Sequence, residues 1–273
     1  MKLLFSIFFL TSFSFAQLEE GTFYLSPSVF YTNGNYSNDI NSNSISFYNT
    51  FELLKSLYLI NHFDYLTIRG RDYNYHQLSF LAGGIVDLFP YWIKFNYAHY
   101  KGNYNYLPYE YSYSDYTNLY NLDLVYYLDW YYFGTSYSFY NQTGFENTHS
   151  HQLTIRLEKI LSDEFFISIK PHFTALKDSK ILFAAYAKLH YAPIYNFVFK
   201  VGGFTGERKY YFDSDLLTIF NQNAVQKHQI FGQIEYSPAN FIKLIAGYQH
   251  NKFTDFSVDY LYAGIKGNFQ IAK

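Results

Sequence analysis

The sequence predicts an all-β fold, a single antiparallel up-and-down barrel of about fourteen strands. Large apolar side chains alternate with small or polar ones along most of the chain, which is the two-residue period of a β-strand. The alternating segments are about 10 residues long and are separated by turn signals. Aromatic residues, which favour strands, make up 24% of the chain, with 33 Tyr and 30 Phe.

The average polarity of the chain indicates that the strands themselves cross a membrane. Only 15% of the residues are charged, yet the mean hydropathy is -0.17, below that expected of a helical membrane protein. No later stretch offers the roughly 18 to 20 unbroken apolar residues that a spanning helix needs. A membrane barrel combines aromatic rings on its outer face with polar groups in its lumen, which gives this composition. A large soluble β-protein is the alternative, although so high an aromatic content would be unusual there.

Fourteen segments in chain order carry the strand pattern. In the first, Phe23, Leu25 and Val29 stand opposite Ser26 and Ser28. The hairpin around residues 180 to 203 repeats the pattern on both of its arms. The expected strands are 21–31, 44–53, 57–65, 78–88, 91–100, 120–128, 131–139, 152–158, 165–174, 181–191, 195–203, 228–236, 241–250 and 257–271.

The connections alternate between tight turns and longer polar loops. The expected turns are Lys55-Ser56, Phe89-Pro90, Leu128-Asp129, Ser162-Asp163, Ala192-Pro193 and Ser237 to Asn240. The expected loops are 33–43, 69–76, 101–115, 141–150, 205–227 and 251–256, with one short loop at 177–180. A soluble sandwich has no reason to alternate its loop lengths, whereas a membrane barrel inserted from one side keeps its short turns together in the periplasm.

The first sixteen residues have the pattern of a secretory signal peptide. Lys2 provides the positive charge, residues 3 to 10 form an apolar run, and Ser14-Phe15-Ala16 is a small-x-small cleavage signature. We expect cleavage before Gln17, which leaves 17–273 as the barrel. A retained membrane anchor is the alternative, but the run is too short to span a bilayer.

Charge and cysteine content exclude several classes of function. The 20 basic and 22 acidic residues are interleaved and give a net charge of -2, so there is no basic stripe for nucleic acid. The absence of cysteine excludes disulfides, thiolate nucleophiles and cysteine metal sites. We expect neither a cofactor nor a metal.

From Gln17 to Lys273, the chain resembles the Gram-negative outer-membrane β-barrels of the porin-like class. The resemblance depends on the leader, the strand alternation and the loop rhythm, and no family motif contributes to it. It implies insertion in the outer membrane by the barrel-assembly machinery, contact with membrane lipid and lipopolysaccharide, and passage of small hydrophilic solutes. One departure concerns the C-terminus, which ends Phe269-Gln270-Ile271-Ala272-Lys273 where such barrels often end in an aromatic residue.

If the more apolar side of each strand faces outward, the ionisable residues face the lumen. These side chains would then either solvate and cross-link the wall or act on solutes. In the second case, a basic wall would oppose an acidic one, and the transverse field would orient dipolar solutes. The basic wall would comprise Arg156, Lys170, Lys188 and Lys200, and the acidic wall Asp64, Asp87 and Asp123. The other expected lumen residues are Glu52, His62, Lys94, Glu158, His172, His190, Glu235, Lys243 and Lys266.

The long loop 205–227 is the expected constriction. It carries an apolar cluster, Leu216, Leu217, Ile219 and Phe220, that an exposed loop does not need. Asp213 or Ser214 could cap a short helix whose apolar side packs into the barrel mouth. An extracellular flap or extended strand tips are the alternatives. The charged residues of this constriction loop are Glu207, Arg208, Lys209, Asp213 and Asp215.

Other patterns point less specifically to chemistry. Pairs such as His149 and His151, or Asp213 and Asp215, offer too few ligands to specify a metal. No motif marks a catalytic nucleophile. Tyrosines of the third loop could stack on sugars, but they fit an outer aromatic girdle or strand extensions better. They are Tyr104, Tyr106, Tyr109, Tyr111, Tyr113 and Tyr116.

Three functions fit a barrel of this kind. The first is a channel for diffusion of small hydrophilic solutes through a charged, aromatic-lined lumen, since fourteen strands enclose more space than side chains alone fill. The second is a non-conducting barrel that serves as an envelope scaffold or surface-interaction module. The third and least favoured is a lipid-modifying barrel enzyme.

Overall fold

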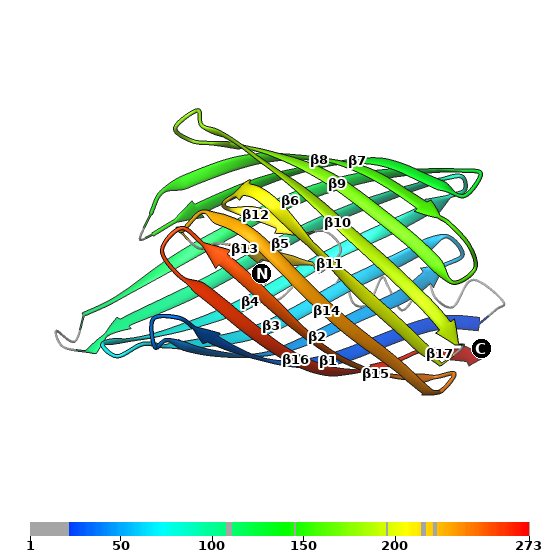
Figure 1. Cartoon of the computed structure of the whole chain (residues 1–273), viewed down its shortest axis with the longest axis horizontal. Coiled ribbons are helices and arrows are strands. Elements are labelled where there is room, and N and C mark those ends of the chain that lie inside the picture. The colour runs from blue at the N-terminus through cyan, green and yellow to red at the C-terminus, as the bar shows by residue number, and fades with distance from the viewer. Residues whose placement is uncertain are drawn as a thin grey trace, which may run out of the picture.

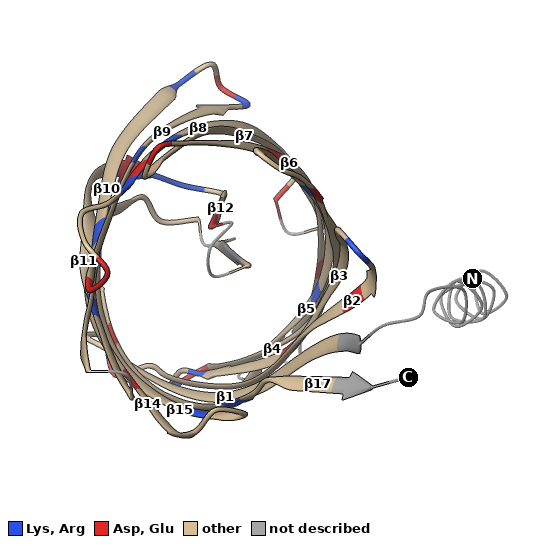
Figure 2. Ribbon diagram, turned by 90° about the vertical axis from the view of Figure 1, so that its right-hand side faces the viewer, with Lys and Arg blue, Asp and Glu red and all other residues tan. Residues whose placement is uncertain are grey.

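The computed structural model describes residues 22–107, 111–144, 146–194, 196–213, 217–220 and 223–272. One antiparallel sheet closes on itself to form a barrel (Figures 1 and 2). Because β16 and β17 pair in succession with β1, they are two pieces of one wall strand, and the barrel has fourteen strands as the sequence predicts. The predicted signal peptide, 1–16, lies outside the described residues.

Apart from β17, a short continuation of β16 with 4 residues, the wall strands vary between 11 residues in β16 and 18 in β6. They are β1 (Thr22–Tyr36), β2 (Asn41–Leu54), β3 (Leu57–Arg69), β4 (Tyr73–Leu88), β5 (Tyr91–Tyr106), β6 (Tyr111–Leu128), β7 (Tyr131–Thr143), β8 (Thr148–Ile160), β9 (Phe165–Leu176), β10 (Ile181–Ile194), β11 (Phe197–Arg208), β14 (Gln226–Ala239), β15 (Ile242–Phe253), β16 (Ser257–Gly267) and β17 (Phe269–Ala272). No α-helix occurs in the part of the chain that the structure describes. Accordingly, none of the described segments is a helix that could span a membrane.

The two faces of the wall have opposite polarity, as β8 illustrates. Gln152, Thr154 and Arg156 are buried on its inward face, whereas Leu153 and Leu157 are exposed on its outward face. Throughout the barrel, the buried polar residues are mainly Ser, Thr, Asn and Gln, and the exposed apolar residues are mainly Leu, Ile, Phe and Tyr. A soluble protein shows the reverse arrangement. The outward face therefore suits lipid, and the inward face suits water.

Several predicted loops are in fact continuations of the strands. The predicted loop 33–43 shrinks to 37–40 and the loop 69–76 to 70–72, because β1, β2, β3 and β4 extend into them. The loop 101–115 becomes the tips of β5 and β6, where Tyr104 stacks on Tyr73 and Tyr113. These segments were predicted as loops because their side chains are polar. Beyond the membrane, however, both faces of a β-hairpin can be solvated, so polar residues also occur in strands. Tyr109 lies outside the described residues.

The hairpin of β10 and β11 turns later than the sequence predicts. Because Ile194 pairs with Phe197, β10 continues past Ala192-Pro193, which instead falls in a register shift of this strand. Pro193 has no N–H to donate to the ladder, so a bulge accommodates it. The expected turn at Ala192-Pro193 was therefore wrong, although the hairpin itself is present.

A small second hairpin lies inside the barrel. It consists of β12 (Tyr211–Asp213) and β13 (Thr218–Phe220), which are paired in antiparallel fashion. The end-on view places β12 within the ring of wall strands (Figure 2). The helix expected here was wrong for the described residues, because aromatic and β-branched residues such as Tyr211 and Ile219 favour strands. Ser214, Asp215 and Leu216 lie outside the described residues.

Candidate functional site

The inward face of the wall is a network of short polar side chains. On β5 to β7, the amide of Asn96 donates to Asn121 Oδ1 at 2.9 Å, and Asn121 Nδ2 lies 2.8 Å from Ser136 Oγ and 3.0 Å from Ser138 Oγ. On β2 and β3, Ser46 Oγ donates to Asp64 at 2.5 Å. These side chains hydrogen-bond along the wall and give the barrel interior a hydrophilic lining.

Four charged residues on β6, β8 and β9 form what we call the balanced cluster: Asp123, Arg156, Glu158 and Lys170. The Arg156 guanidinium lies 3.2 Å from Asp123 and 3.0 Å from Glu158. Lys170 Nζ lies 3.5 Å from Glu158, which also accepts a 2.7 Å hydrogen bond from Ser168. All four side chains are buried, and their formal charges cancel.

A second group on β11, β14, β15 and β16 forms what we call the basic cluster: Lys200, Glu235, Lys243 and Lys266. Glu235 forms ion pairs with Lys200 and with Lys243, the latter at 2.7 Å. Gln233 Nε2 donates to the same carboxylate at 2.7 Å. Lys266 stands directly opposite Lys243 in the pairing of β15 and β16. Three lysines and one glutamate leave this cluster with a formal charge of two positive units.

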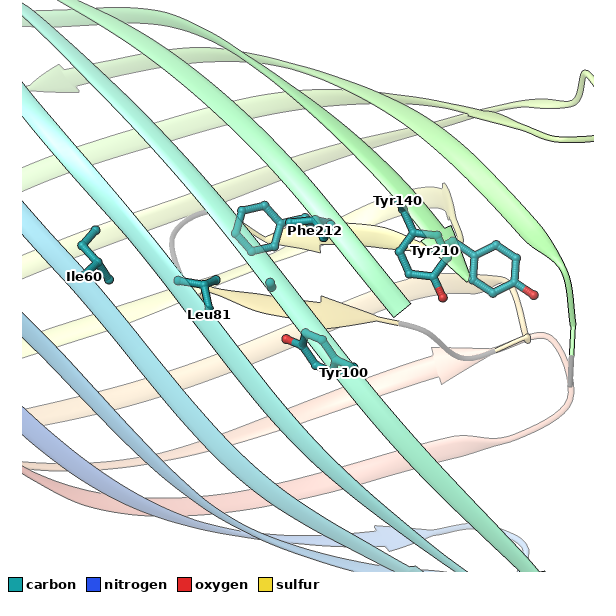
Figure 3. Close-up of a cluster of buried hydrophobic side chains, with 8 residues drawn as sticks. Ile60, Leu81, Tyr100, Tyr140, Tyr210 and Phe212 are labelled. Atoms are coloured by element: carbon teal, nitrogen blue, oxygen red, sulfur yellow. The ribbon is translucent and has the colours of Figure 1, made fainter. Parts of the chain in front are cut away.

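The inner hairpin is fixed to the wall by an apolar cluster. Tyr210 and Phe212 pack with Leu81, Tyr100 and Tyr140, which project from β4, β5 and β7 (Figure 3). Ile60, Ala98 and Leu119 complete the buried set, and Leu217 packs against it. Water is thereby excluded between the hairpin and this side of the wall.

Hydrogen bonds from β8 hold the same edge of the hairpin. The Gln152 amide donates to the Phe212 carbonyl at 2.9 Å and accepts from the Phe212 N–H at 2.8 Å. Ser150 Oγ donates to the Tyr210 carbonyl at 2.6 Å, and the Tyr210 hydroxyl donates to Glu146 at 2.7 Å. Burial, together with the Glu146 carboxylate, raises the pKa of Tyr210 above its usual range, so the hydroxyl remains a donor.

Arg208 anchors the base of the hairpin. Its guanidinium carbon lies 3.5 Å from the centroid of the Phe204 ring and 3.8 Å from that of Tyr211, and the side chain is fully buried. Its Nε donates to Gln226 at 3.0 Å, and Nη2 donates to Gln229. A desolvated guanidinium between aromatic faces is held firmly, so Arg208 joins the hairpin to β11 and β14.

The remaining predicted site residues are dispersed along the wall. Glu52, Asp87 and Lys188 lie on β2, β4 and β10, on the same side of each strand as its buried residues, and Lys94 stands directly opposite Asp123. Glu207 pairs with Lys227 and, at 3.5 Å, with Lys180. Phe220 stacks on Tyr211, with the ring centroids 4.4 Å apart, and Asp213 ends β12. Asp215 is not among the described residues.

The two opposing walls expected from the sequence do not form as predicted. Asp123 was placed on the acidic wall, but it is bonded to Arg156 of the expected basic wall. Arg156 reaches it because both strands flank β7 and the long side chain spans the gap. Of the four basic-wall residues, Arg156 and Lys170 are thus neutralised within the balanced cluster.

Sequence reasoning missed the groups that organise these clusters. Gln152, Gln229 and Gln233 hold the hairpin and the Glu235 carboxylate, but a lone glutamine on an inward face looks like any other polar residue. Arg208 was noted only as a charged loop residue; the aromatic residues at 204, 211 and 220 were the available signal for its cage. Over the described residues, no three or more His, Cys, Asp or Glu side chains are placed to hold a metal ion.

No family model matches this sequence, and no curated protein matches it. Solved structures do resemble the fold. The "CymD monoaromatic hydrocarbon channel" superposes with a TM-score of 0.60 and 10% identity over 97% of this chain and 92% of that one. The "TodX monoaromatic hydrocarbon channel deltaS2 mutant" gives 0.58 and 9% over 93% and 91%. The P. putida toluene transporter TodX gives 0.53 and 7% over 95% and 92%. The chain therefore has the fold of the outer-membrane β-barrels, as the sequence predicts.

Proposed function

We propose that this protein is an outer-membrane channel through which small hydrophilic solutes diffuse, and that the β12–β13 hairpin narrows its lumen. The observation that carries the proposal is the charged and polar inward face within an apolar outward face. Ionisable groups at membrane depth are costly unless they face water or partners, so Arg156, Lys170 and Glu235 require a hydrated or bonded interior. Several similar structures carry channel or transporter in their names, which agrees with this use of the fold.

In this proposal the outward face contacts outer-membrane lipid and lipopolysaccharide, and the short turns face the periplasm. The constriction comprises the hairpin and its base, with Glu207, Arg208, Asp213 and Phe220, and includes Asp215 from the sequence. Arg208 and the apolar cluster around Phe212 hold the hairpin across part of the lumen. Solutes would then pass on the side of the hairpin that faces away from β4 to β8.

Single-channel recording in planar bilayers tests this proposal. We expect the folded wild-type barrel to open, and we expect a variant in which a short Gly-Ser linker replaces 211–220 to conduct more, because the obstacle is removed. A matched control replaces Asp178 and Ser179 with glycine, which alters a short connection at the same end but leaves the hairpin intact. If neither the wild type nor the linker variant opens, the channel proposal is refuted. If the two conduct equally, the hairpin is not a constriction.

A non-conducting scaffold is the second candidate, and the packing of the hairpin favours it. Ala98 and Leu119 on the wall are completely covered, and Phe212 is 1% exposed, so the hairpin fits this side of the lumen closely. If the wild-type barrel stays closed while the hairpin deletion conducts, the native protein is a plugged barrel.

The names of the similar structures suggest a different solute class, monoaromatic hydrocarbons. The wall residues of the apolar cluster would offer such a molecule an apolar surface only if Tyr210 and Phe212 moved away from them. Uptake of toluene into proteoliposomes, compared between the wild type and the hairpin deletion, distinguishes this route from passage of hydrophilic solutes.

A further inference from the structure

We propose that the basic cluster is a binding station for oxyanions, so that solutes bearing a carboxylate or phosphate group are preferred. The proposal deepens the channel function and rests on it. The station comprises Lys200, Lys243 and Lys266 around Glu235, all on the inward side of four neighbouring wall strands.

The first argument is the arrangement of like charges. Lys243 and Lys266 are direct partners in the ladder of β15 and β16, and both lie on the inward side. Directly opposed residues have their Cβ atoms about 5 Å apart, and like charges there destabilise the sheet. Glu235 is the one carboxylate that forms ion pairs in this cluster, so an anion from solution can offset the remaining charge of the pair.

The second argument is the lack of a partner for Lys266. This side chain is only partly exposed, and among the described residues it forms neither a hydrogen bond nor an ion pair. The charged groups near enough to act on it are Lys243, Glu235 and Lys200, two cations and one anion. A partly desolvated ammonium in this field gains from each negative oxygen that comes within reach.

The third argument is that both carboxylate oxygens of Glu235 already accept hydrogen bonds from other residues. Its Oε1 accepts from Lys200 and Gln233, and its Oε2 accepts from Lys243 at 2.7 Å. The Tyr262 hydroxyl donates to the Gln233 amide at 2.9 Å. This bond orients the amide, which in turn donates to the Glu235 carboxylate. Turning Glu235 toward Lys266 would break these bonds, so the carboxylate positions Lys200 and Lys243 and leaves Lys266 available.

The position of the station fits passage through a channel. Lys243 is the second residue of β15 and Lys266 the last but one of β16, so the cluster lies near the end of the barrel that carries the short turns. His190 is the ladder partner of Lys200, and Lys188 lies on the same side of β10, which extends the basic surface along the wall. An anion that passes the hairpin reaches this surface before it leaves the barrel.

Reversal potentials in a KCl gradient test the station in the channel. We expect the wild type to prefer chloride over potassium and Lys266→Gln to lower the preference on the order of twofold. Inorganic phosphate added to the short-turn side should reduce the chloride current of the wild type and have a weaker effect on the variant. Lys252→Gln is the matched control, because Lys252 is an exposed β15 residue near the other end of the barrel.

A melting experiment tests the station without ion flow. We expect phosphate, exchanged for chloride at constant ionic strength, to raise the melting temperature of the detergent-folded wild type and of Lys252→Gln, but not that of Lys266→Gln. If the barrel never conducts but phosphate has this selective effect, the binding station is supported and the channel is refuted. If the barrel conducts but shows no anion preference and no phosphate effect specific to Lys266, the channel stands and the station is overturned.

Discussion

The balanced cluster and the basic cluster are both built from four charged residues on the inward face of the barrel, yet they differ in net charge and exposure. In the balanced cluster, two cations meet two carboxylates, and every side chain is at most 9% exposed. In the basic cluster, three lysines surround one carboxylate that pairs with two of them, and Lys200 and Lys243 are 24% and 27% exposed. The first network is balanced in charge and cross-links the wall, whereas the second carries excess positive charge on a more exposed part of the inward face.

The largest effect should come from Arg156→Met. This change removes the cation between Asp123 and Glu158 and leaves two buried carboxylates near each other. We expect the free energy of unfolding to fall by about 3 kcal/mol, at the low end for a buried pair because Lys94 remains opposite Asp123. Reversible urea unfolding in detergent micelles measures it. Adding Asp123→Asn should recover part of the loss, and a loss below about 1 kcal/mol would mean that the pair behaves like an exposed one.

A smaller loss is expected from Glu235→Gln in the basic cluster. The amide keeps the size of the side chain but removes the negative charge among three lysines, which costs about 1 to 2 kcal/mol at low ionic strength. The lysines are partly exposed, so salt should screen the repulsion and shrink the loss. Unfolding at low and at high salt measures this, and a loss of stability that salt leaves unchanged would place the cluster in the same class as the balanced one.

The barrel wall could be predicted from the sequence because its pattern is local. Each strand repeats a two-residue period in which the apolar side is exposed and the polar side, with residues such as Glu158 and Lys170, is buried. The limits of the strands could not be predicted as well. Residues 33–36 and 41–43 are polar, and polarity alone does not separate a loop from a solvated hairpin tip.

The contents of the lumen could not be predicted because they depend on contacts across the barrel. The pairing of Arg156 with Asp123 spans an intervening strand, and the fit of Phe212 against Leu81 joins residues more than a hundred positions apart in the sequence. The apolar residues of the long loop did indicate that something there is buried. The sequence left a short helix, a flap and extended strand tips as alternatives for this loop, and the strand propensity of its residues favours the extended form.

The smallest effect should come from Lys243→Gln, and it sharpens the comparison most. The change removes a bond to Glu235 but also removes the repulsion between Lys243 and Lys266, so we expect the unfolding free energy at low salt to change by less than about 0.5 kcal/mol. Lys170→Gln is the matched change in the balanced cluster, where two carboxylates already compensate the two cations, and it should cost about 1 kcal/mol or more. Urea unfolding of both variants in the same detergent measures the difference. Equal losses of unfolding free energy in the two variants would mean that the lysines of the basic cluster are compensated as fully as Lys170. Lys266 would then not be available to bind an anionic solute.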